Sequence, residues 1–160
     1  MSLKDFCLEM QGQGLASKTV DPEIVAHEFV RFYSLPKIIT LARIKQLAKS
    51  LGIEKVYPEE LPAGYRGYHF GSNGRYELQY RQGDWVGSAE HTAFHEIYEI
   101  IEETFEQVSN EFERRTGKSC EIAANAFAAA VLMQTEHFLS DVLDQSLDVL
   151  KLQNPMMRSS

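Results

Sequence analysis

The spacing of apolar residues changes twice along this chain, and this change limits the possible folds more than any other feature. Residues 21–52 repeat apolar side chains with the period of an amphipathic helix, and the same period returns from residue 88 onward. Between these regions, residues 68–70 and 75–81 flank a Gly-Ser-Asn-Gly sequence typical of a hairpin turn, and the second segment alternates apolar with polar side chains. The sequence therefore predicts an α+β fold, in which a small antiparallel sheet packs against a mainly helical bundle.

Local signals divide the chain into an arm, one domain and a tail. Residues 1–20 are polar and show no sustained period, so we expect a flexible N-terminal arm. Asp21 and Pro22 are typical of the start of a helix, where an acidic side chain caps free amides and proline is tolerated. We therefore expect a single domain at residues 21–154, followed by a C-terminal tail at residues 155–160.

Charge and composition narrow the functional classes. The 160 residues carry 16 Lys and Arg against 23 Asp and Glu, a formal net charge of −7, which disfavours broad binding of nucleic acid through its phosphates. No apolar run approaches the roughly 18 residues of a membrane span, and the N-terminus lacks the apolar core of a secretion signal. With only Cys7 and Cys120, no disulfide framework is expected. These features predict a cytoplasmic protein that contacts neither membranes nor nucleic acid directly.

The segment most informative about chemistry is H-E-I-Y-E at residues 95–99, within a predicted helix at residues 88–112. His95 and Glu99 are four residues apart, so their side chains lie side by side on the helix. Both can therefore reach one divalent cation, at about 2.0–2.2 Å from each donor atom. Glu96 points further round the helix, which suits the general base of an H-E-x-x-H zinc helix. Here a glutamate, itself an acceptable zinc ligand, stands in the position of the second histidine.

A second register of the same helix uses His91 and His95, which are also four residues apart, as the ligand pair. That register places Thr92 where the general base would stand, and a hydroxyl is a poor base at neutral pH. We therefore prefer the first register, and we expect His91 to orient a ligand from outside the donor set of the metal.

A catalytic zinc site normally uses three protein ligands and one open position. Glu121 is the candidate for the third ligand, because it lies in the first turn of the next predicted helix, residues 119–133, where the helix dipole favours an ionised carboxylate. Asn125 is one turn later on the same face and could orient a ligand or a substrate. The alanines of this helix allow the close approach to a neighbouring helix that a shared metal site would need.

The remaining acidic side chains and histidines have simpler interpretations. Several glutamates near the end of the metal helix and beyond it are expected on a solvated face, namely Glu102, Glu103, Glu106, Glu111 and Glu113. The other histidines, His27, His69 and His137, are expected at the surface or in capping positions.

Two segments together resemble the ImmA/IrrE family of metallopeptidases: AFHEIYEII around the metal helix and EIAANAFAAAVLM in the helix that follows. Upstream, IITLARIKQLAKSLGI and LPAGYRG occupy the places of the family's leading helix and the start of a strand, so the resemblance covers roughly residues 25–140. The resemblance implies a zincin-like fold. It also implies that His95, Glu99 and Glu121 hold Zn²⁺, or alternatively Mn²⁺, and that Glu96 is the catalytic base.

The resemblance further implies a zinc-dependent intracellular peptidase, since members of this family cleave helix-turn-helix repressors. No helix-turn-helix module is expected in this chain, so the repressor is expected to be a protein substrate on a separate chain. Glu99 replaces the family's second histidine, which gives an alternative function. The chain would then be a catalytically weakened or inactive protease-like module that binds a repressor or a phage regulatory protein.

Overall fold

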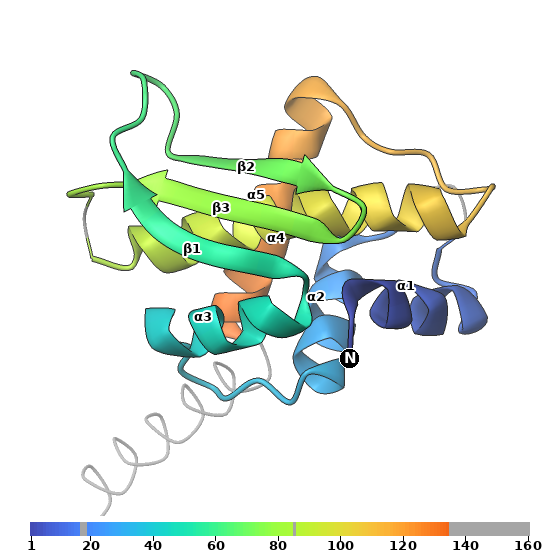
Figure 1. Cartoon of the computed structure of the whole chain (residues 1–160). Helices are drawn as coiled ribbons and strands as arrows, with labels where there is room; N and C mark the ends of the chain where they lie inside the picture. The colour runs from blue at the N-terminus through green and yellow to red at the C-terminus, as the bar shows by residue number, and fades with distance from the viewer. Residues whose placement is uncertain (17–18, 85, 135–160) are drawn as a thin grey trace, which may run out of the picture.

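The computed structural model describes residues 1–16, 19–84 and 86–134, and their arrangement is an α+β fold, as the sequence predicts (Figure 1). The elements of this part of the chain are, in order, α1 (Leu3–Gly12), α2 (Pro22–Phe32), α3 (Leu41–Ser50), β1 (Ile53–Glu59), β2 (Gly67–Ser72), β3 (Arg75–Arg81), α4 (Ser88–Val108) and α5 (Gly117–Met133). None of these helices has both the length and the apolar character that crossing a bilayer requires.

The three strands form one mixed sheet in the order β1-β3-β2. β2 and β3 are the arms of the predicted hairpin and pair antiparallel, with Gly67 opposite Tyr80 and Ser72 opposite Arg75. β1 pairs parallel to β3, so the prediction of a wholly antiparallel sheet is wrong. After β1 the chain crosses to the far edge of the sheet, where it forms β2. The hairpin then returns the chain as β3, which lies between β1 and β2 and runs in the same direction as β1. Turn residues indicate only how the two strands next to the turn pair. The parallel pairing of β1 with β3 therefore has no local sequence signal.

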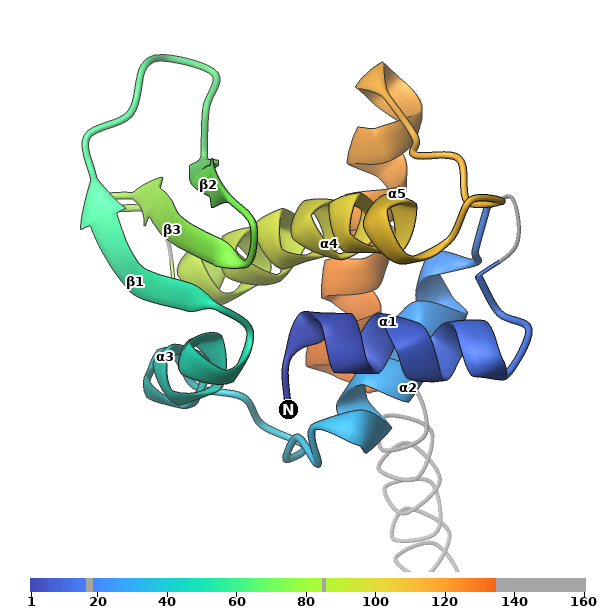
Figure 2. The same ribbon diagram turned by 45° about the vertical axis from the view of Figure 1, so that its right-hand side comes forward.

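α4 is the central helix of the fold. It packs against β2 and β3 of the sheet and also against α5, which crosses it (Figure 2). The predicted apolar side of α4 is buried, including Phe94, Ile97 and Ile101. α5 can approach closely because Ala124 and Ala128 are small and fully buried. Two helices in such close contact can present polar side chains to one shared site.

The first residues of the chain differ from their prediction. Instead of a flexible arm, Leu3–Gly12 form α1, which begins with a capping box between Ser2 and Asp5 and packs against α4. The ring of Phe6 is buried and meets Phe29 of α2 edge-on, with the ring centroids 5.5 Å apart. A helix this short depends on such tertiary contacts for its stability, and the local sequence does not report them.

Other predicted boundaries lie close to the observed ones. α2 begins at Pro22, and the side chain of Asp21 accepts a hydrogen bond from the Glu23 amide at 2.9 Å, as its capping role predicts. The last stretch of the predicted domain, residues 135–154, and the predicted tail, residues 155–160, lie outside the described residues.

One acidic side chain that the sequence places on a solvated face is instead buried. Glu102 on α4 has no exposed surface, and its carboxylate accepts from the Arg115 guanidinium at 2.6 Å and from the Arg115 backbone amide at 2.8 Å. The same guanidinium donates to the Tyr98 hydroxyl and to the Val20 carbonyl. These bonds fasten the segment before α5 to α4, so they help to fix where α5 begins.

Candidate metal centre

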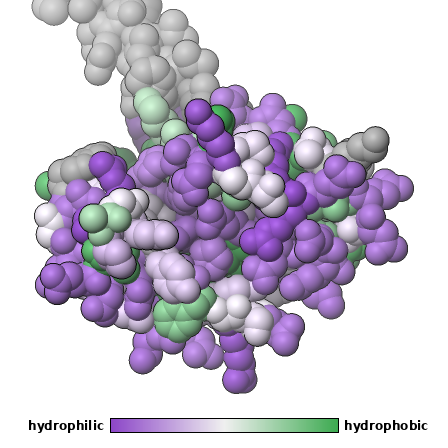
Figure 3. Space-filling model, turned by 90° about the horizontal axis from the view of Figure 1, so that it is seen from above, coloured by the Kyte–Doolittle hydropathy of each residue, from purple (hydrophilic) through white to green (hydrophobic). Residues whose placement is uncertain are grey.

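A cavity of about 620 Å³ opens between α4, the N-terminal half of α5 and the segment that leads into β2. It is lined by residues 64–69 on the β2 side, by His91, Thr92, His95, Glu96 and Glu99 of α4, and by Glu121 and Asn125 of α5. Figure 3 views the molecule from above, the side on which β2 and the first turns of α5 lie, and most side chains on this face are hydrophilic. Every site residue that the sequence predicts therefore lines one cavity.

The three predicted ligands lie together. One donor atom from each of His95, Glu99 and Glu121 lies within 4.8 Å of the other two, and His95 Nε2 is 3.0 Å from a Glu121 carboxylate oxygen. The first two side chains project from consecutive turns of α4, and the third comes from α5. Two helices thus bring one nitrogen and two oxygen donors to a single point, as the spacing of the motifs predicts.

Glu121 lies further into its helix than predicted. α5 begins at Gly117 rather than Ser119, so Glu121 is in the second turn, and the first turn contains no acidic residue. The helix dipole is weaker at that position. The Glu121 side chain is 60% exposed, so its proximity to His95, rather than the dipole, makes it a candidate ligand.

Glu96 is the most buried carboxylate of the cavity, with 5% of its surface exposed. Burial alone would raise its pKa, but the neighbouring imidazoles of His69, which forms an ion pair with it, and His95, which hydrogen-bonds to it, lower the pKa of Glu96 to about 2. The nearest ring atom of His95, Nδ1, is 3.4 Å from Glu96 Oε2. Glu96 is therefore ionised and able to accept a proton, and its role as the general base stays a prediction.

The pKa of Glu99 is shifted in the opposite direction to that of Glu96. Burial and the adjacent Glu96 carboxylate raise the pKa of Glu99 to about 7, because both disfavour a second negative charge in the same space. A cation between the ligands would remove this penalty and release the proton. Cys120 lies beside this carboxyl, with Sγ 3.9 Å from Glu99 Oε1. Burial raises the pKa of the Cys120 thiol to about 11, so the thiol is protonated at neutral pH in the metal-free protein.

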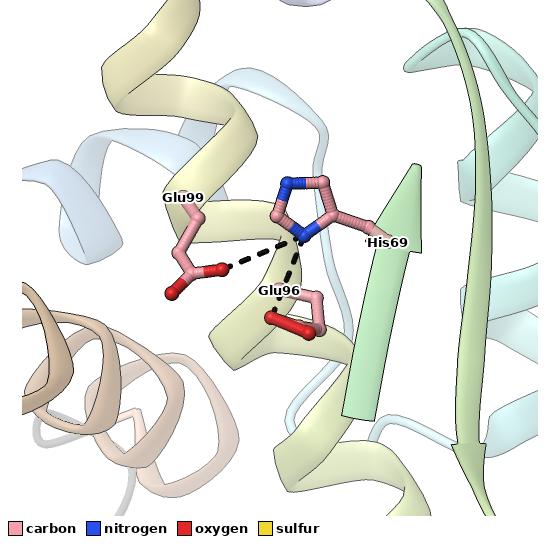
Figure 4. Close-up of side chains that lie close together, drawn as sticks. All are labelled: His69, Glu96 and Glu99. Carbon is pink, nitrogen blue, oxygen red and sulfur yellow. Dashed lines mark ion pairs between the residues drawn. The ribbon is translucent and has the colours of Figure 1, made fainter. Parts of the chain in front are cut away.

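His69 belongs to this cavity, although the sequence interpretation places it at the surface or in a cap. It projects from β2 toward α4, and its Nδ1 lies 3.6 Å from Glu96 Oε2 and 3.5 Å from Glu99 Oε2 (Figure 4). The signal that could have identified it is the alternation of side chains in β2. Gly67 and His69 face the helix, whereas the intervening Tyr68 is exposed on the other face.

His91 and Asn125 also line the cavity, each one turn away from a candidate ligand on its own helix. Burial and the neighbouring His95 lower the pKa of His91, so its imidazole is neutral at pH 7 and can both donate and accept a hydrogen bond. Asn125 is exposed at the rim. Their expected role, which is to orient a ligand or a substrate, stays a prediction.

The donor set fits a divalent transition metal. Imidazole nitrogen and carboxylate oxygen are ligands that both Zn²⁺ and Mn²⁺ accept, and the cavity leaves room for a position open to water or substrate. The buried Nδ1 of His69 has no hydrogen-bond partner among the described residues, so this polar cluster is incomplete without a further charged or polar species. The cluster therefore has the chemistry and the room that a metal centre requires.

Comparison with known proteins bears directly on this cavity. The family model described as IrrE N-terminal-like domain, Peptidase_M78, matches residues 48–154 of the chain. The matched residues include the sheet, α4, α5 and every candidate site residue. No curated protein and no solved structure matches the chain.

Proposed function

Because this chain belongs to the IrrE N-terminal-like domain family of peptidases, Peptidase_M78, we propose that it is a zinc-dependent peptidase with Glu96 as its catalytic base. The family confirms the resemblance that the sequence indicates, and the zincin-like assignment of the fold follows from it. The observation that carries the proposal is the convergence of His95, Glu99 and Glu121, from two helices, on one point. Mn²⁺ is the alternative ion for the same donors.

The chain's own residues supply the acid–base chemistry. A divalent cation bound by the three ligands would polarise a peptide carbonyl and make water easier to deprotonate. Glu96, ionised at the wall of the cavity, accepts the proton of the attacking water and can pass it to the leaving amine. Since only 5% of Glu96 is exposed, few solvent molecules compete for that proton.

The sheet edge beside the cavity supports a polypeptide substrate. β2 is at the end of the strand order and pairs on one side only within the described residues, and its first residues line the cavity. An extended peptide can therefore add to β2 through backbone hydrogen bonds and pass close to Glu96. This arrangement favours cleavage within an extended segment of a protein.

We propose a helix-turn-helix repressor on a separate chain as the protein substrate, in an intracellular setting. The resemblance to the ImmA/IrrE metallopeptidases supports this choice. The formal net charge of −7 also favours encounter with a basic partner, and DNA-binding repressors carry basic surfaces.

Glu99 supports a second candidate function. With glutamate in place of the second histidine, the site carries more negative charge, which weakens a bound ion as a Lewis acid. Such a chain could keep the fold and the metal and bind a repressor or a phage regulatory protein without cutting it.

Two measurements on the full chain test these proposals. Elemental analysis of the purified protein gives the metal content, and intact-mass analysis after incubation with a purified helix-turn-helix repressor detects cleavage. We expect at least one zinc ion per chain in the wild type, less zinc in Glu121→Ala than in the wild type, and retained zinc with lost cleavage in Glu96→Gln. Glu106→Gln, at an exposed position of α4, is the matched control and should keep both properties.

Each outcome separates the candidates. A chain that binds neither zinc nor manganese would contradict the peptidase proposal. A chain that binds zinc and the repressor but yields no fragments would favour the binding module. Cleavage that persists in Glu96→Gln would contradict the role of Glu96 as the base.

A further inference from the structure

A second group of potential ligands lies beside the first. The donor atoms of His69, Glu96 and Glu99 all lie within 4.8 Å of one another, where β2 faces α4 (Figure 4). His69 Nδ1 is buried, and no hydrogen-bond partner reaches it among the residues described. Within the described part of the chain, the nitrogen forms ion pairs with both carboxylates but no hydrogen bond, whereas buried polar atoms are normally hydrogen-bonded.

The distances in this group suit a shared ion better than hydrogen bonds. His69 Nδ1 is 3.6 Å from Glu96 Oε2 and 3.5 Å from Glu99 Oε2, beyond the usual N–H···O separation of about 2.7–3.2 Å. Two donors that each lie about 2.1 Å from one tetrahedral ion are about 3.4 Å apart. The observed separations are therefore close to those of atoms that hold a cation between them.

We propose that His69, Glu96 and Glu99 form a second divalent-cation site. This site shares Glu99 with the site of His95, Glu99 and Glu121, so one carboxylate bridges two ions. The inference rests on the proposed function, because it assigns a regulatory property to the same cavity.

Occupation of the second site inhibits the peptidase. A cation coordinated by Glu96 lowers the proton affinity of the whole carboxylate, because the positive charge favours its ionised form. A chain that holds both ions therefore has a weakened base, whereas a chain that holds only the ion of His95, Glu99 and Glu121 keeps Glu96 uncoordinated. Excess zinc should consequently suppress cleavage, and His69 is the residue through which this inhibition acts.

Zinc titration of the metal-free full chain, followed by native mass spectrometry and calorimetry, counts the ions without an activity assay. We expect two ions in the wild type and one ion in both His69→Ala and Glu96→Gln, since each substitution removes a ligand of the second site only. Glu96→Gln preserves the shape of the side chain and so tests the site even if His69→Ala fails to fold. His27→Ala removes an exposed histidine of α2 and should keep two ions.

The result separates this inference from the proposed function. One ion in the wild type at saturating zinc, or two ions retained in the folded ligand variants, would overturn the second site and leave the peptidase proposal standing. A wild type that binds no zinc would overturn both. With a cleavable substrate, excess zinc should inhibit the wild type but not His69→Ala, and equal inhibition of the two would overturn the regulatory role of His69.

Discussion

Glu99 should destabilise the metal-free protein at neutral and higher pH, and the substitution Glu99→Gln should reveal this effect. Burial and the Glu96 carboxylate raise the pKa of Glu99 from 4.5 to about 7, so the fold favours the protonated form. The unfolded chain ionises Glu99 at its ordinary pKa. Stability therefore falls as the pH rises through about 4.5 to 7, and the loss persists at higher pH. Glutamine has the shape of the protonated side chain and cannot ionise, so it removes this loss.

The size of the effect follows from the two pKa values. A difference of one unit between the pKa values in the folded and unfolded states changes the free energy of unfolding by about 1.4 kcal/mol. With the pKa of Glu99 raised from 4.5 to about 7, the ionised side chain costs up to about 3 kcal/mol. Because 20% of the side chain is exposed, solvent screens part of the penalty, and we expect a net effect of about 2 kcal/mol.

Urea denaturation of the metal-free protein, in the presence of a chelator, measures this difference. At pH 8, Glu99→Gln should exceed the wild type in free energy of unfolding by about 2 kcal/mol, and the difference should disappear near pH 4.5. Saturating zinc should reverse the order at pH 8, because the wild type binds the ion better and binding stabilises the folded state. Glu106→Gln should have no effect. A Glu99→Gln variant no more stable than the wild type at pH 8 in chelator would refute this electrostatic account.

Zinc affinity should increase from about pH 6 to pH 8, because zinc must displace the proton that Glu99 retains through its raised pKa. Calorimetry in buffers of different ionisation enthalpy measures this proton release. A zinc affinity that does not change over this range would contradict the linkage. Arg115→Met should lower the free energy of unfolding by about 3–5 kcal/mol in urea denaturation, because it leaves the Glu102 carboxylate buried without its partner. Gly67→Ala should cost about 1–3 kcal/mol and reduce the zinc stoichiometry. Its Cβ would lie 2.3 Å from Thr92 Cγ2 and push β2 away from α4, and wild-type stability and stoichiometry in this variant would contradict that packing.

Elements whose signals lie within a few residues could be predicted from the sequence. Asp21 caps α2, and the turn before Arg75 closes the hairpin, because capping and turn chemistry act over three or four residues. The sequence could not predict that residues 3–12 form the helix α1, nor that β1 pairs parallel with β3. α1 depends on its contact with α4, and the parallel pair joins residues far apart in sequence, such as Ile53 and Tyr76.

The candidate site divides in the same way. His95 and Glu99 could be predicted because one helical turn separates them, and Glu121 because its helix resembles a known family block. The position of His69 depends on which face of the hairpin packs against α4, and this packing is set by tertiary contacts. His69 lies between aromatic residues in β2, so the sequence does not indicate which face is buried. A residue can thus lie beside the candidate metal ligands in space although its spacing from them in the sequence does not indicate a shared site.

The buried pair of Glu102 and Arg115 links the fold to the alignment of the candidate ligands. The two helices of the site are joined by residues 109–116, and Arg115 holds the end of this connection on α4 through bonds of 2.6 and 2.8 Å to Glu102. α5 must therefore begin beside the middle of α4, and its second turn then brings Glu121 to His95. Burial of the Glu102 carboxylate carries a desolvation cost, and its bonds to Arg115 help to place the candidate ligand Glu121 beside His95.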